Sequence, residues 1–362
     1  MEKIMSLSVS VYTVPTDRPE SDGTLEWNST TMILVELAAA GKMGMGYTYA
    51  APSLAGFIDQ TLKPLVVGHN PLNTQEIFKA MEVAIRNEGN CGMARMALSA
   101  VDNALWDLKA KILDLPLCSL IGTVRSEALV YGSGGFTSYT DHQLEKQLGG
   151  WAEDGLINVK MKVGRHPGKD LHRVKTARKA IGKDVELYVD ANGAYDTKQS
   201  LEQAEKFTEH GVTWFEEPVS SDNLKGLHLI REHAPHTIKI AAGEYGYNDA
   251  YFLNMLEQGA VDVLQADATR CGGITGFLKA GQLCEAFQLP FSFHCAPAMH
   301  LHASLCLNAF FIGEYFHDHV RIEQLFFDGA IKPEKGYLKP DLSRPGYGLD
   351  FKERDAAPYK VA

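Results

Sequence analysis

The sequence lacks the features that define several classes of protein. It contains no apolar run long enough to cross a bilayer, and its opening residues, MEKIMSLSVSVYTVP, have no basic segment followed by a long apolar core, as a signal peptide would. The formal net charge is −10, and no run of basic residues occurs. Such a chain is poorly suited to binding nucleic acid or an acidic membrane surface. We therefore expect a cytoplasmic protein without a membrane or nucleic-acid partner.

Cysteine is scarce, and no two of the six cysteines form a CxxC pair. Such pairs mark many zinc sites and redox motifs, so the sequence offers no sign of either. Isolated cysteines of cytoplasmic proteins are reduced thiols, and most of them pack in the interior. We expect this state for Cys91, Cys118, Cys271, Cys284, Cys295 and Cys306.

The first 125 residues are predicted to form a small α+β domain. With 362 residues, 45% of them hydrophobic, the chain can bury a large core, and one large domain with a smaller one is the natural expectation. An alternating run at residues 3–15 and two apolar runs at 31–50 indicate a β-meander. The polar residues 16–30 between them are expected to form a mobile loop. Helical spacing follows over residues 52–122.

From about residue 127, short apolar runs alternate with amphipathic segments of helical length. We count eight runs at intervals of roughly 20 to 30 residues, the period of a βα unit. Eight such units close into a (β/α)8 barrel of the TIM type, which we predict for residues 126–325. An open doubly wound sheet is the alternative, but no glycine-rich phosphate turn follows the first run. The Gly- and Pro-rich residues 326–362 are expected to pack back on the N-terminal domain and complete a cap.

Ionisable or polar residues end almost every predicted barrel strand, where the active site of such a barrel lies. A single strand-end carboxylate is usually a helix cap or part of a surface ion pair, and a single histidine is usually a hydrogen-bonded core residue. Burying so many charges without partners is costly, however, and one shared site explains them jointly. The residues are Lys160, Lys162, Asp190, Asn192, Glu216, Glu217, Glu244, Asp267, His294 and Glu314.

Asp190, Glu216 and Glu244 end three successive predicted strands and offer only oxygen ligands. Such a set, with room left for water and substrate, favours Mg²⁺ over zinc. The two lysines are two residues apart and share one face of their strand, on one side of the expected metal. Asp267 and His294 would lie on the other side, where a carboxylate fixes the tautomer of an imidazole and raises its basicity.

The motif order Lys-x-Lys, Asp-x-Asn, Glu-Glu-Pro, Gly-Glu, Asp and His resembles the enolase superfamily, and within it the mandelate racemase subgroup. The stretch SAVDNALWDLKAKILDLPLCSLIG, residues 99–122, is similar to the end of the capping domain in that family. The resemblance covers nearly the whole chain. It implies an enzyme that removes the proton next to a substrate carboxylate, with Mg²⁺ stabilising the enediolate that forms.

The resemblance also implies a role for each strand-end residue. Lys160 would pair with the substrate carboxylate, and Lys162 would be the base, with a pKa lowered by Lys160 and by the metal. The other implied roles are Mg²⁺ binding by Asp190, Glu216 and Glu244, a hydrogen bond from Glu314 to the second enediolate oxygen, and a place for Asn192 near the metal or a substrate hydroxyl.

The pair Asp267 and His294 bears on which reaction follows proton removal. The sixth strand reads LQADATRCGG, without the lysine that muconate-lactonising and dipeptide-epimerase relatives usually carry there. The pair could protonate a departing hydroxyl, so that water leaves a sugar acid (an aldonate or aldarate) and a 2-keto-3-deoxy acid forms. This dehydration is favoured by analogy. Racemisation or epimerisation of a 2-hydroxy acid and lactone cycloisomerisation also fit the residues, whereas a non-catalytic binding protein would be expected to lack one of them.

Substrate choice in the family lies in the capping loops and in residues beside the strand ends. Arg270 could bind a distal carboxylate or form a surface salt bridge. In the stretch FHDH, residues 316–319, His317 and His319 suggest a metal site beside Glu314, but a solvated loop is the expectation. His300 and His302 are expected on different sides of a helix. Relatives are commonly homo-oligomers, so the resemblance implies an assembly of identical chains. Candidates for substrate contact, for which packing is the alternative role, are Trp27, Tyr47, Tyr49 and Ser133.

Overall fold

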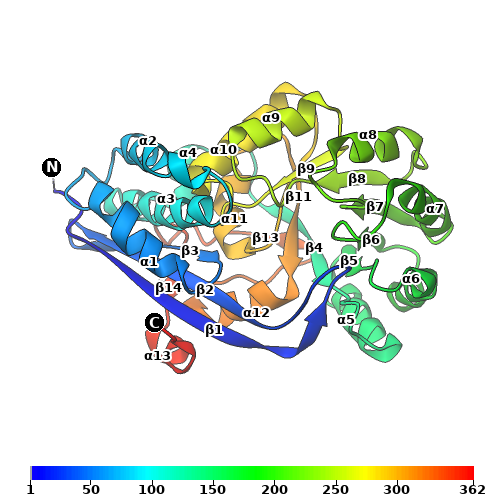
Figure 1. The fold of residues 1–362 in the computed structure, drawn as a ribbon. Helices are drawn as coiled ribbons and strands as arrows, with labels where there is room; N and C mark the ends of the chain where they lie inside the picture. The colour runs from blue at the N-terminus through cyan, green and yellow to red at the C-terminus, as the bar shows by residue number, and fades with distance from the viewer. Residues whose placement is uncertain (1) are drawn as a thin grey trace.

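The structure, a computed structural model, describes residues 2–362. Figure 1 shows two parts side by side, a smaller one in blue and cyan and a barrel in green to orange. Within the described residues, no helix is both long and apolar enough to cross a membrane.

The N-terminal part is an antiparallel sheet of order β1–β2–β3 with helices packed against it. The strands are β1 at Ser6–Ser21, β2 at Glu26–Ala39 and β3 at Lys42–Tyr49. Helix α3 approaches the sheet closely because Gly46 has no side chain: a Cβ there would lie 2.4 Å from Ala100 O. The helices are α1 at Leu54–Phe57, α2 at Thr74–Ala84, α3 at Gly92–Ile112 and α4 at Leu117–Ile121, with short turns at Ile58–Leu62, Lys63–Leu65 and Arg86–Glu88.

The prediction of a loop over residues 16–30 is wrong. Strand β1 continues to Ser21 and β2 begins at Glu26, so the two strands form a long hairpin, with a shift of register between Pro15 and Glu20. Asp22 closes the turn by accepting the backbone N–H of the second and third residues after it, at 2.7 and 2.6 Å. The stretch is polar, but backbone groups make the hydrogen bonds of a ladder, so polar side chains do not prevent strand pairing.

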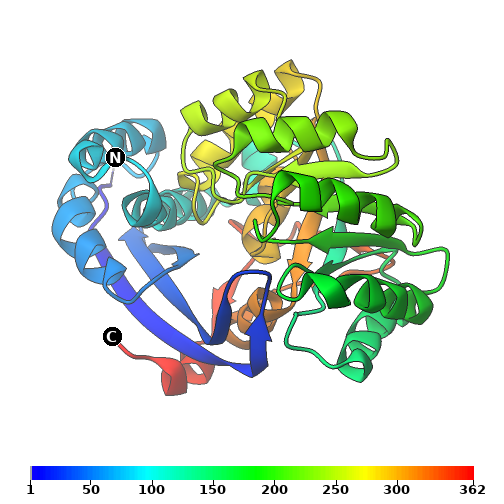
Figure 2. The ribbon, with the colours of Figure 1, turned by 45° about the vertical axis from the view of Figure 1, so that its right-hand side comes forward.

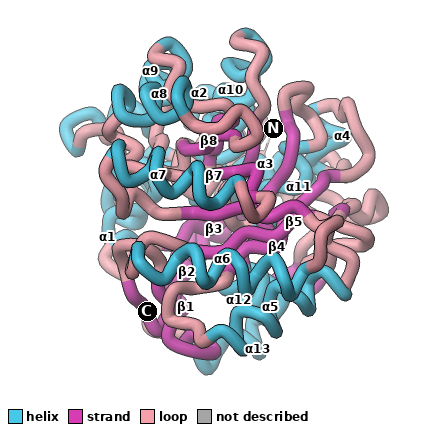
Figure 3. The backbone as a smooth tube through the Cα atoms, turned by 90° about the vertical axis from the view of Figure 1, so that its right-hand side faces the viewer, coloured by secondary structure: helices cyan, strands magenta, loops and turns pink. Residues whose placement is uncertain are grey.

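Eight parallel strands form a closed barrel, as the sequence predicts. β11 pairs with β4, so the ring has no free edge. Figure 3 shows helices on the outside of these strands. The strands are β4 at Ala128–Gly134, β5 at Asn158–Lys162, β6 at Glu186–Asp190, β7 at Val212–Glu216, β8 at Lys239–Ala242, β9 at Val263–Ala266, β10 at Phe291–Phe293 and β11 at Phe310–Phe316. The helices are α5 at Asp141–Glu153, α6 at Pro167–Ile181, α7 at Thr197–Thr208, α8 at Leu224–His233, α9 at Asp249–Glu257, α10 at Gly273–Ala286, α11 at Pro297–Ser304 and α12 at His317–Phe326.

The two faces of β5 explain its sequence, NVKMK. Val159 and Met161 belong to the large core that the barrel shares with its helices. Lys160 and Lys162 alternate with them and therefore point into the barrel. Aromatic side chains, among them Tyr131 and Trp214, fill the interior beside Lys160. The lysines thus lie on a packed aromatic layer.

Helix α3 fixes the loop that follows β9. Asp102 accepts hydrogen bonds from both the backbone N–H (2.9 Å) and the hydroxyl (2.8 Å) of Thr275. Asn103 donates to Ala268 O at 3.0 Å. All these groups are buried, where hydrogen bonds define position strongly. The capping part therefore holds the segment that carries Asp267 and Arg270.

The C-terminal residues contact both parts of the molecule. β12 at Phe327–Asp328 pairs with β14 at Asp350–Phe351, and β13 at Tyr337–Leu338 pairs with β4 of the barrel. Short helical turns follow, α13 at Glu353–Ala356 and a 3-10 turn at Ala357–Tyr359. Val361 N then donates to Val11 O at 2.8 Å, which attaches the end of the chain to β1. Figures 1 and 2 both show the red C-terminus near that blue strand.

Candidate active site

A cavity of about 420 Å³ lies between the carboxyl ends of the barrel strands and the β1–β2 hairpin. The barrel contributes Lys162, Asn192, Glu244, Tyr245, Arg270, His294, Cys295, Phe316 and His319 to its wall. The capping part contributes Asp22, Leu25, Trp27, Ser29, Thr30, Thr31, Tyr49, Ala50 and Ala51. The cavity therefore lies where the sequence predicts the active site of a barrel enzyme.

The three predicted metal ligands converge at this cavity. Asp190 ends β6 and pairs in register with Glu216 at the end of β7, and Glu244 follows β8. Each offers a carboxylate oxygen, and these oxygens lie within 4.8 Å of one another. Oε2 of Glu244 is buried and, within residues 2–362, accepts no hydrogen bond. An oxygen-only donor set with a buried oxygen lacking a donor fits a hard divalent cation such as Mg²⁺.

The two lysines lie against these carboxylates. Lys160 Nζ contacts Glu216 directly and lies 2.8 Å from Glu314 Oε1. Lys162 Nζ lies 2.5 Å from Asp190 Oδ2. Both lysines are almost fully buried, which requires partners of opposite charge.

The protein's own groups raise the pKa of Lys162, whereas the sequence predicts a pKa lowered by Lys160 and by the metal. Burial, the largest influence, lowers this pKa, and Lys160 lowers it as well. Asp190 and other carboxylates raise it, and together they place it above the ordinary value. The sequence argument weighed the neighbouring ammonium group and the metal but left out the carboxylate that Lys162 contacts.

Two neutral hydrogen-bond donors in the barrel interior orient the carboxylate of Glu216. Its Oε2 accepts hydrogen bonds from Trp214 Nε1 and Gln265 Nε2, both at 3.0 Å. These donors hold one oxygen in place while the other faces Lys160 and the carboxylate cluster. The sequence analysis did not identify Gln265, although its position two residues before Asp267 on β9 places it on the same face of that strand.

Asp267 and His294 form the predicted pair. His294 Nδ1 lies 2.8 Å from Asp267 Oδ2, and Thr269 N donates to the other oxygen at 2.7 Å. Burial alone would raise the pKa of Asp267, but the hydrogen bond from His294 and the charges around it lower that pKa below its usual range. His294 Nε2 is therefore left to face Glu244 Oε2 at 3.5 Å.

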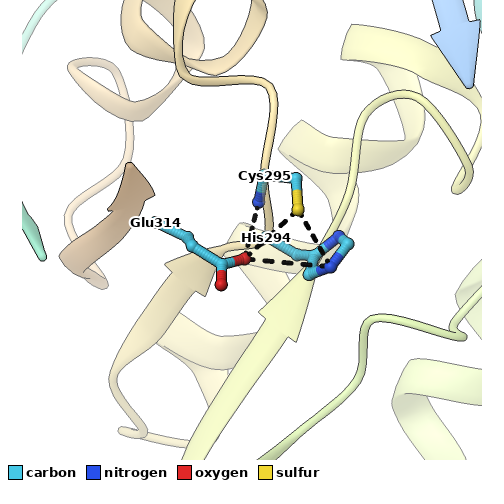
Figure 4. A group of neighbouring side chains, drawn as sticks. All are labelled: His294, Cys295 and Glu314. Atoms are coloured by element: carbon cyan, nitrogen blue, oxygen red, sulfur yellow. Dashed lines mark hydrogen bonds and ion pairs between the residues drawn. The ribbon is translucent and has the colours of Figure 1, made fainter. Parts of the chain in front are cut away.

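Cys295 is a site residue that the sequence analysis classed with the packing thiols. All six cysteines are free thiols in the described chain. Cys295 has a positive φ of 52°, and its backbone N–H donates to Glu314 Oε2 at 2.9 Å. Its Sγ lies 3.1 Å from His294 Nε2, and Figure 4 shows the three side chains converging at the ends of β10 and β11. Its place directly after a strand-end histidine was the available signal.

Glu314 is held on both oxygens. Ser133 Oγ donates to Oε1 at 2.6 Å, and the backbone of Cys295 binds Oε2. Ser133 was a candidate for substrate contact, but its hydroxyl is buried against Glu314. Ser133 therefore positions the carboxylate of Glu314.

The aromatic candidates separate into two kinds. Trp27 and Tyr49 line the cavity, and Tyr49 stacks on His319 with ring centroids 3.6 Å apart. The assignment of Tyr47 to substrate contact is wrong, because its hydroxyl is buried and donates to Glu323 at 2.5 Å. The two side chains share one face of β3, so alternation does not separate them; Tyr47 stacks on Phe327, whereas Tyr49 lies at the strand end beside the cavity.

Arg270 and Asn192 also reach the cavity. Arg270 lies 3.4 Å from Glu244 Oε1 and 3.7 Å from Asp267 Oδ2, so it links the metal-ligand candidate to the histidine pair. Asn192 follows Asp190 with a positive φ of 46°, and its backbone N–H donates to Asp190 Oδ1 at 2.9 Å. The surface salt bridge considered from the sequence is wrong, because Arg270 is internal to the site; contact with a distal carboxylate of a substrate stays a prediction.

The expectation of a solvated loop at FHDH is wrong. His317 begins helix α12, and Asp318 and His319 are buried. Asp318 accepts hydrogen bonds from Thr30 of the hairpin and from Arg321, and these offset the cost of burying its carboxylate. The prediction failed because the hairpin covers this segment, and the sequence gives no sign of that contact.

His300 and His302 do lie on helix α11; His300 accepts from Ala268 N at 2.7 Å and serves as a structural residue.

Comparison with known families agrees with this geometry. Residues 143–356 match the model described as enolase C-terminal domain-like, and residues 7–122 match the N-terminal domain of mandelate racemase and muconate lactonizing enzyme. The chain belongs to the enolase superfamily, in the mandelate racemase/muconate lactonizing enzyme subgroup.

Three proteins illustrate what the chain is similar to in sequence and structure. A mandelate racemase/muconate lactonizing enzyme-like protein from Rubrobacter xylanophilus is 51% identical, with a TM-score of 0.97 over 99% of this chain and 100% of that one. A racemase from Streptomyces coelicolor A3(2), solved with bound magnesium, is 27% identical, with a TM-score of 0.92 over 99% of this chain and 100% of that one. An arabinonate dehydratase from Saccharolobus solfataricus is 28% identical over 84% of this chain and 82% of its own length.

Proposed function

We propose that this enzyme is a Mg²⁺-dependent dehydratase of sugar acids, which removes the proton next to the carboxylate and then eliminates water. The observation that carries the proposal is the carboxylate cluster of Asp190, Glu216 and Glu244, with Lys162 and the Asp267–His294 pair facing the same cavity. The arabinonate dehydratase relative supports the reaction class.

The carboxylate of the substrate would bind at the metal site. Asp190, Glu216 and Glu244 would hold Mg²⁺, which, when bound, offsets their charge and stabilises the negative charge that develops on the substrate carboxylate. Lys160 supplies a further positive charge in the buried floor of the site. Glu314, fixed by Ser133 and by the backbone of Cys295, contacts the second carboxylate oxygen.

Proton transfer is assigned to the two groups beside the metal site. Mg²⁺ held by Asp190 would offset the carboxylate charge that favours the ammonium form of Lys162, and a neutral Lys162 Nζ would take the proton from the carbon next to the carboxylate. The C–O bond of the neighbouring carbon then breaks, and His294 Nε2 gives its proton to the departing hydroxyl, so that water leaves. The remaining enol tautomerises to a 2-keto-3-deoxy acid, with no oxidant or reductant required.

Polar groups on both sides of the cavity support a polyhydroxylated substrate. Oδ1 of Asn192, on the barrel side, and the hydroxyl of Tyr49, on the capping side, are buried cavity groups without a hydrogen-bond partner among residues 2–362. Ser29, Thr31 and Asp22 add polar groups to the same wall. Unpaired buried polar groups are costly, and the hydroxyls of a sugar acid would satisfy them.

Racemisation is the second candidate, because Lys162 and His294 line one cavity and could exchange a proton at opposite faces of one carbon. The magnesium-bound relative described as a racemase supports this reading. One experiment separates the reactions: incubation of the Mg²⁺-loaded enzyme with a library of aldonates, aldarates and 2-hydroxy acids in D₂O. Keto-acid formation supports dehydration, and deuterium uptake without keto acid supports racemisation. Deuterium uptake with a lactone product would indicate cycloisomerisation, and no reaction with any acid would contradict the proposal.

A further inference from the structure

A second cluster of possible metal ligands lies outside the catalytic cavity. It consists of Asp17 and Glu20 of β1 and His317, the first residue of α12. The two carboxylates and the imidazole each offer one ligand atom, and these atoms lie within 4.8 Å of one another. His317 Nε2 is 3.3 Å from Asp17 Oδ1.

Glu20 is the unusual member of this cluster. Its side chain is fully buried, at 0% exposure. Oε2 accepts a hydrogen bond from Trp27 Nε1 at 2.9 Å, but Oε1 has no partner in the part of the chain that the structure describes. Burial, with Asp318 nearby, raises the pKa of Glu20 to about 9. A buried carboxyl oxygen without a donor is costly unless a cation or a proton satisfies it.

The neighbouring charges do not fill this need. The charge of Arg321 affects Glu20, but its guanidinium donates to Asp318 and to Pro15 O. Asp318 is itself paired, with Arg321 and with Thr30. Asp17 and His317 each place a possible ligand atom within 4.8 Å of a carboxylate oxygen of Glu20.

The backbone of β1 brings the cluster together. The pairing of β1 with β2 shifts register between Pro15 and Glu20, so the intervening residues leave the regular ladder. Irregularities of this kind turn side chains away from their alternating positions, often at functional sites. Asp17 reaches α12 from this segment, and Figure 1 shows the hairpin running beside that helix.

We propose that Asp17, Glu20 and His317 bind a divalent transition-metal ion, Zn²⁺ by the chemistry of the ligands, which fastens the capping hairpin to the barrel. One imidazole with two carboxylates is a zinc-type donor set that leaves a fourth position for water, whereas the all-oxygen cluster in the cavity suits Mg²⁺. The ion would bind Oε1 of Glu20, while Oε2 of the same carboxylate accepts the hydrogen bond from Trp27 Nε1. Because Trp27 lines the catalytic cavity, zinc binding would order the wall that covers the substrate.

The test is zinc retention by the full chain in excess Mg²⁺, which keeps the all-oxygen site occupied. After equilibrium dialysis against dilute Zn²⁺, elemental analysis is expected to find one zinc ion per chain. Glu20→Gln, which keeps the shape of the side chain, and His317→Gln, at the partly exposed end of the cluster, are each expected to lose it. Circular dichroism in zinc-free buffer checks the fold; if Glu20→Gln does not fold, His317→Gln decides.

A matched control distinguishes zinc bound at this cluster from zinc bound at a second cluster beside the catalytic cavity. His294, Cys295 and Glu314 also place ligand atoms within 4.8 Å of one another, with a sulfur that zinc favours. Cys295→Ala is therefore expected to keep the bound zinc if the proposal holds. No retained zinc in the wild type, retention by either hairpin-site variant that folds, or loss in Cys295→Ala alone would overturn it. The outcome is independent of any turnover, so it stands or falls separately from the proposed reaction.

Discussion

His294 Nδ1 lies 2.8 Å from Asp267 Oδ2, and this contact directs Nε2 of the imidazole toward Glu244 and Glu314 at 3.5 and 3.8 Å. The carboxylate in turn is held by the backbone N–H of Thr269. Such a chain of contacts fixes both the tautomer and the direction of the ring. By accepting the proton on Nδ1, Asp267 stabilises the imidazolium form of His294, in which Nε2 also carries a proton that it can give to a group in the cavity.

Asp267→Asn tests this dependence. The carboxamide carries no negative charge and cannot stabilise an imidazolium; a neutral imidazole is a much weaker acid at Nε2, and we expect kcat to fall by about 10²- to 10⁴-fold. Steady-state kinetics measure the effect. The matched control is Asp222→Asn, at an exposed position, which should leave kcat unchanged. An Asp267→Asn enzyme with near-normal kcat would remove the pair from proton transfer.

Lys162→Ala and His294→Asn are expected to differ in which step they stop. Each should lower turnover by about 10²- to 10⁴-fold, because each removes a group that moves a proton. Lys162→Ala should also abolish exchange of the substrate α-proton with D₂O, whereas His294→Asn should retain exchange but form no keto acid. Proton NMR in D₂O follows both. Loss of exchange in both variants, or in neither, would contradict the separate roles.

Mg²⁺ should stabilise the folded protein through the carboxylate cluster. An ion that binds only the folded state at 100 times its Kd adds about 2.7 kcal/mol to the free energy of unfolding. We expect this gain in denaturation experiments with and without Mg²⁺, and its loss on chelation. Asp190→Asn should remove most of the gain, while Asp222→Asn should keep it. An equal Mg²⁺ effect in both variants would place the ion elsewhere.

Glu323 should make stability depend on pH. Burial raises its pKa from 4.5 to about 8 although Tyr47 donates a hydrogen bond to it. Because the folded pKa is raised, the stabilising contribution is complete below about pH 4.5 and is lost as pH rises toward about 8. The loss has a slope of about 1.4 kcal/mol per pH unit for one proton.

Urea denaturation across that interval measures the slope in the wild type and in Glu323→Gln. The amide cannot ionise, so the variant should show a flatter profile by this amount. Glu334→Gln, an exposed substitution on the C-terminal segment, should keep the wild-type slope. Identical slopes in wild type and Glu323→Gln would show that this carboxyl is not the source.

The barrel and its strand-end residues follow from the sequence because they depend on local repetition. The βα period places Asp190, Glu216 and Glu244 at equivalent strand ends, and parallel pairing then brings them together whatever the loops do. The same period predicts that Lys160 and Lys162 share a face.

The remainder depends on contacts between distant segments, which local patterns do not encode. Tyr47 and Tyr49 look equivalent in GYTYA, yet only the packing of Glu323 and His319 against them separates their roles. The pKa of Lys162 depends on how close Asp190 lies, and spacing along the chain does not give that distance. Cys295 reaches the site through a backbone turn with positive φ, and no glycine stands at this position to indicate such a turn in the sequence.

The most direct test of the catalytic site is a crystal structure with Mg²⁺ and an unreactive sugar-acid analogue. We predict one magnesium ion bound by Asp190, Glu216 and Glu244 and by the carboxylate of the analogue. Lys162 Nζ should then lie beside the carbon next to that carboxylate, and His294 Nε2 should lie beside the hydroxyl on the following carbon. A magnesium ion away from these three residues, or an analogue that touches neither Lys162 nor His294, would contradict the proposed chemistry.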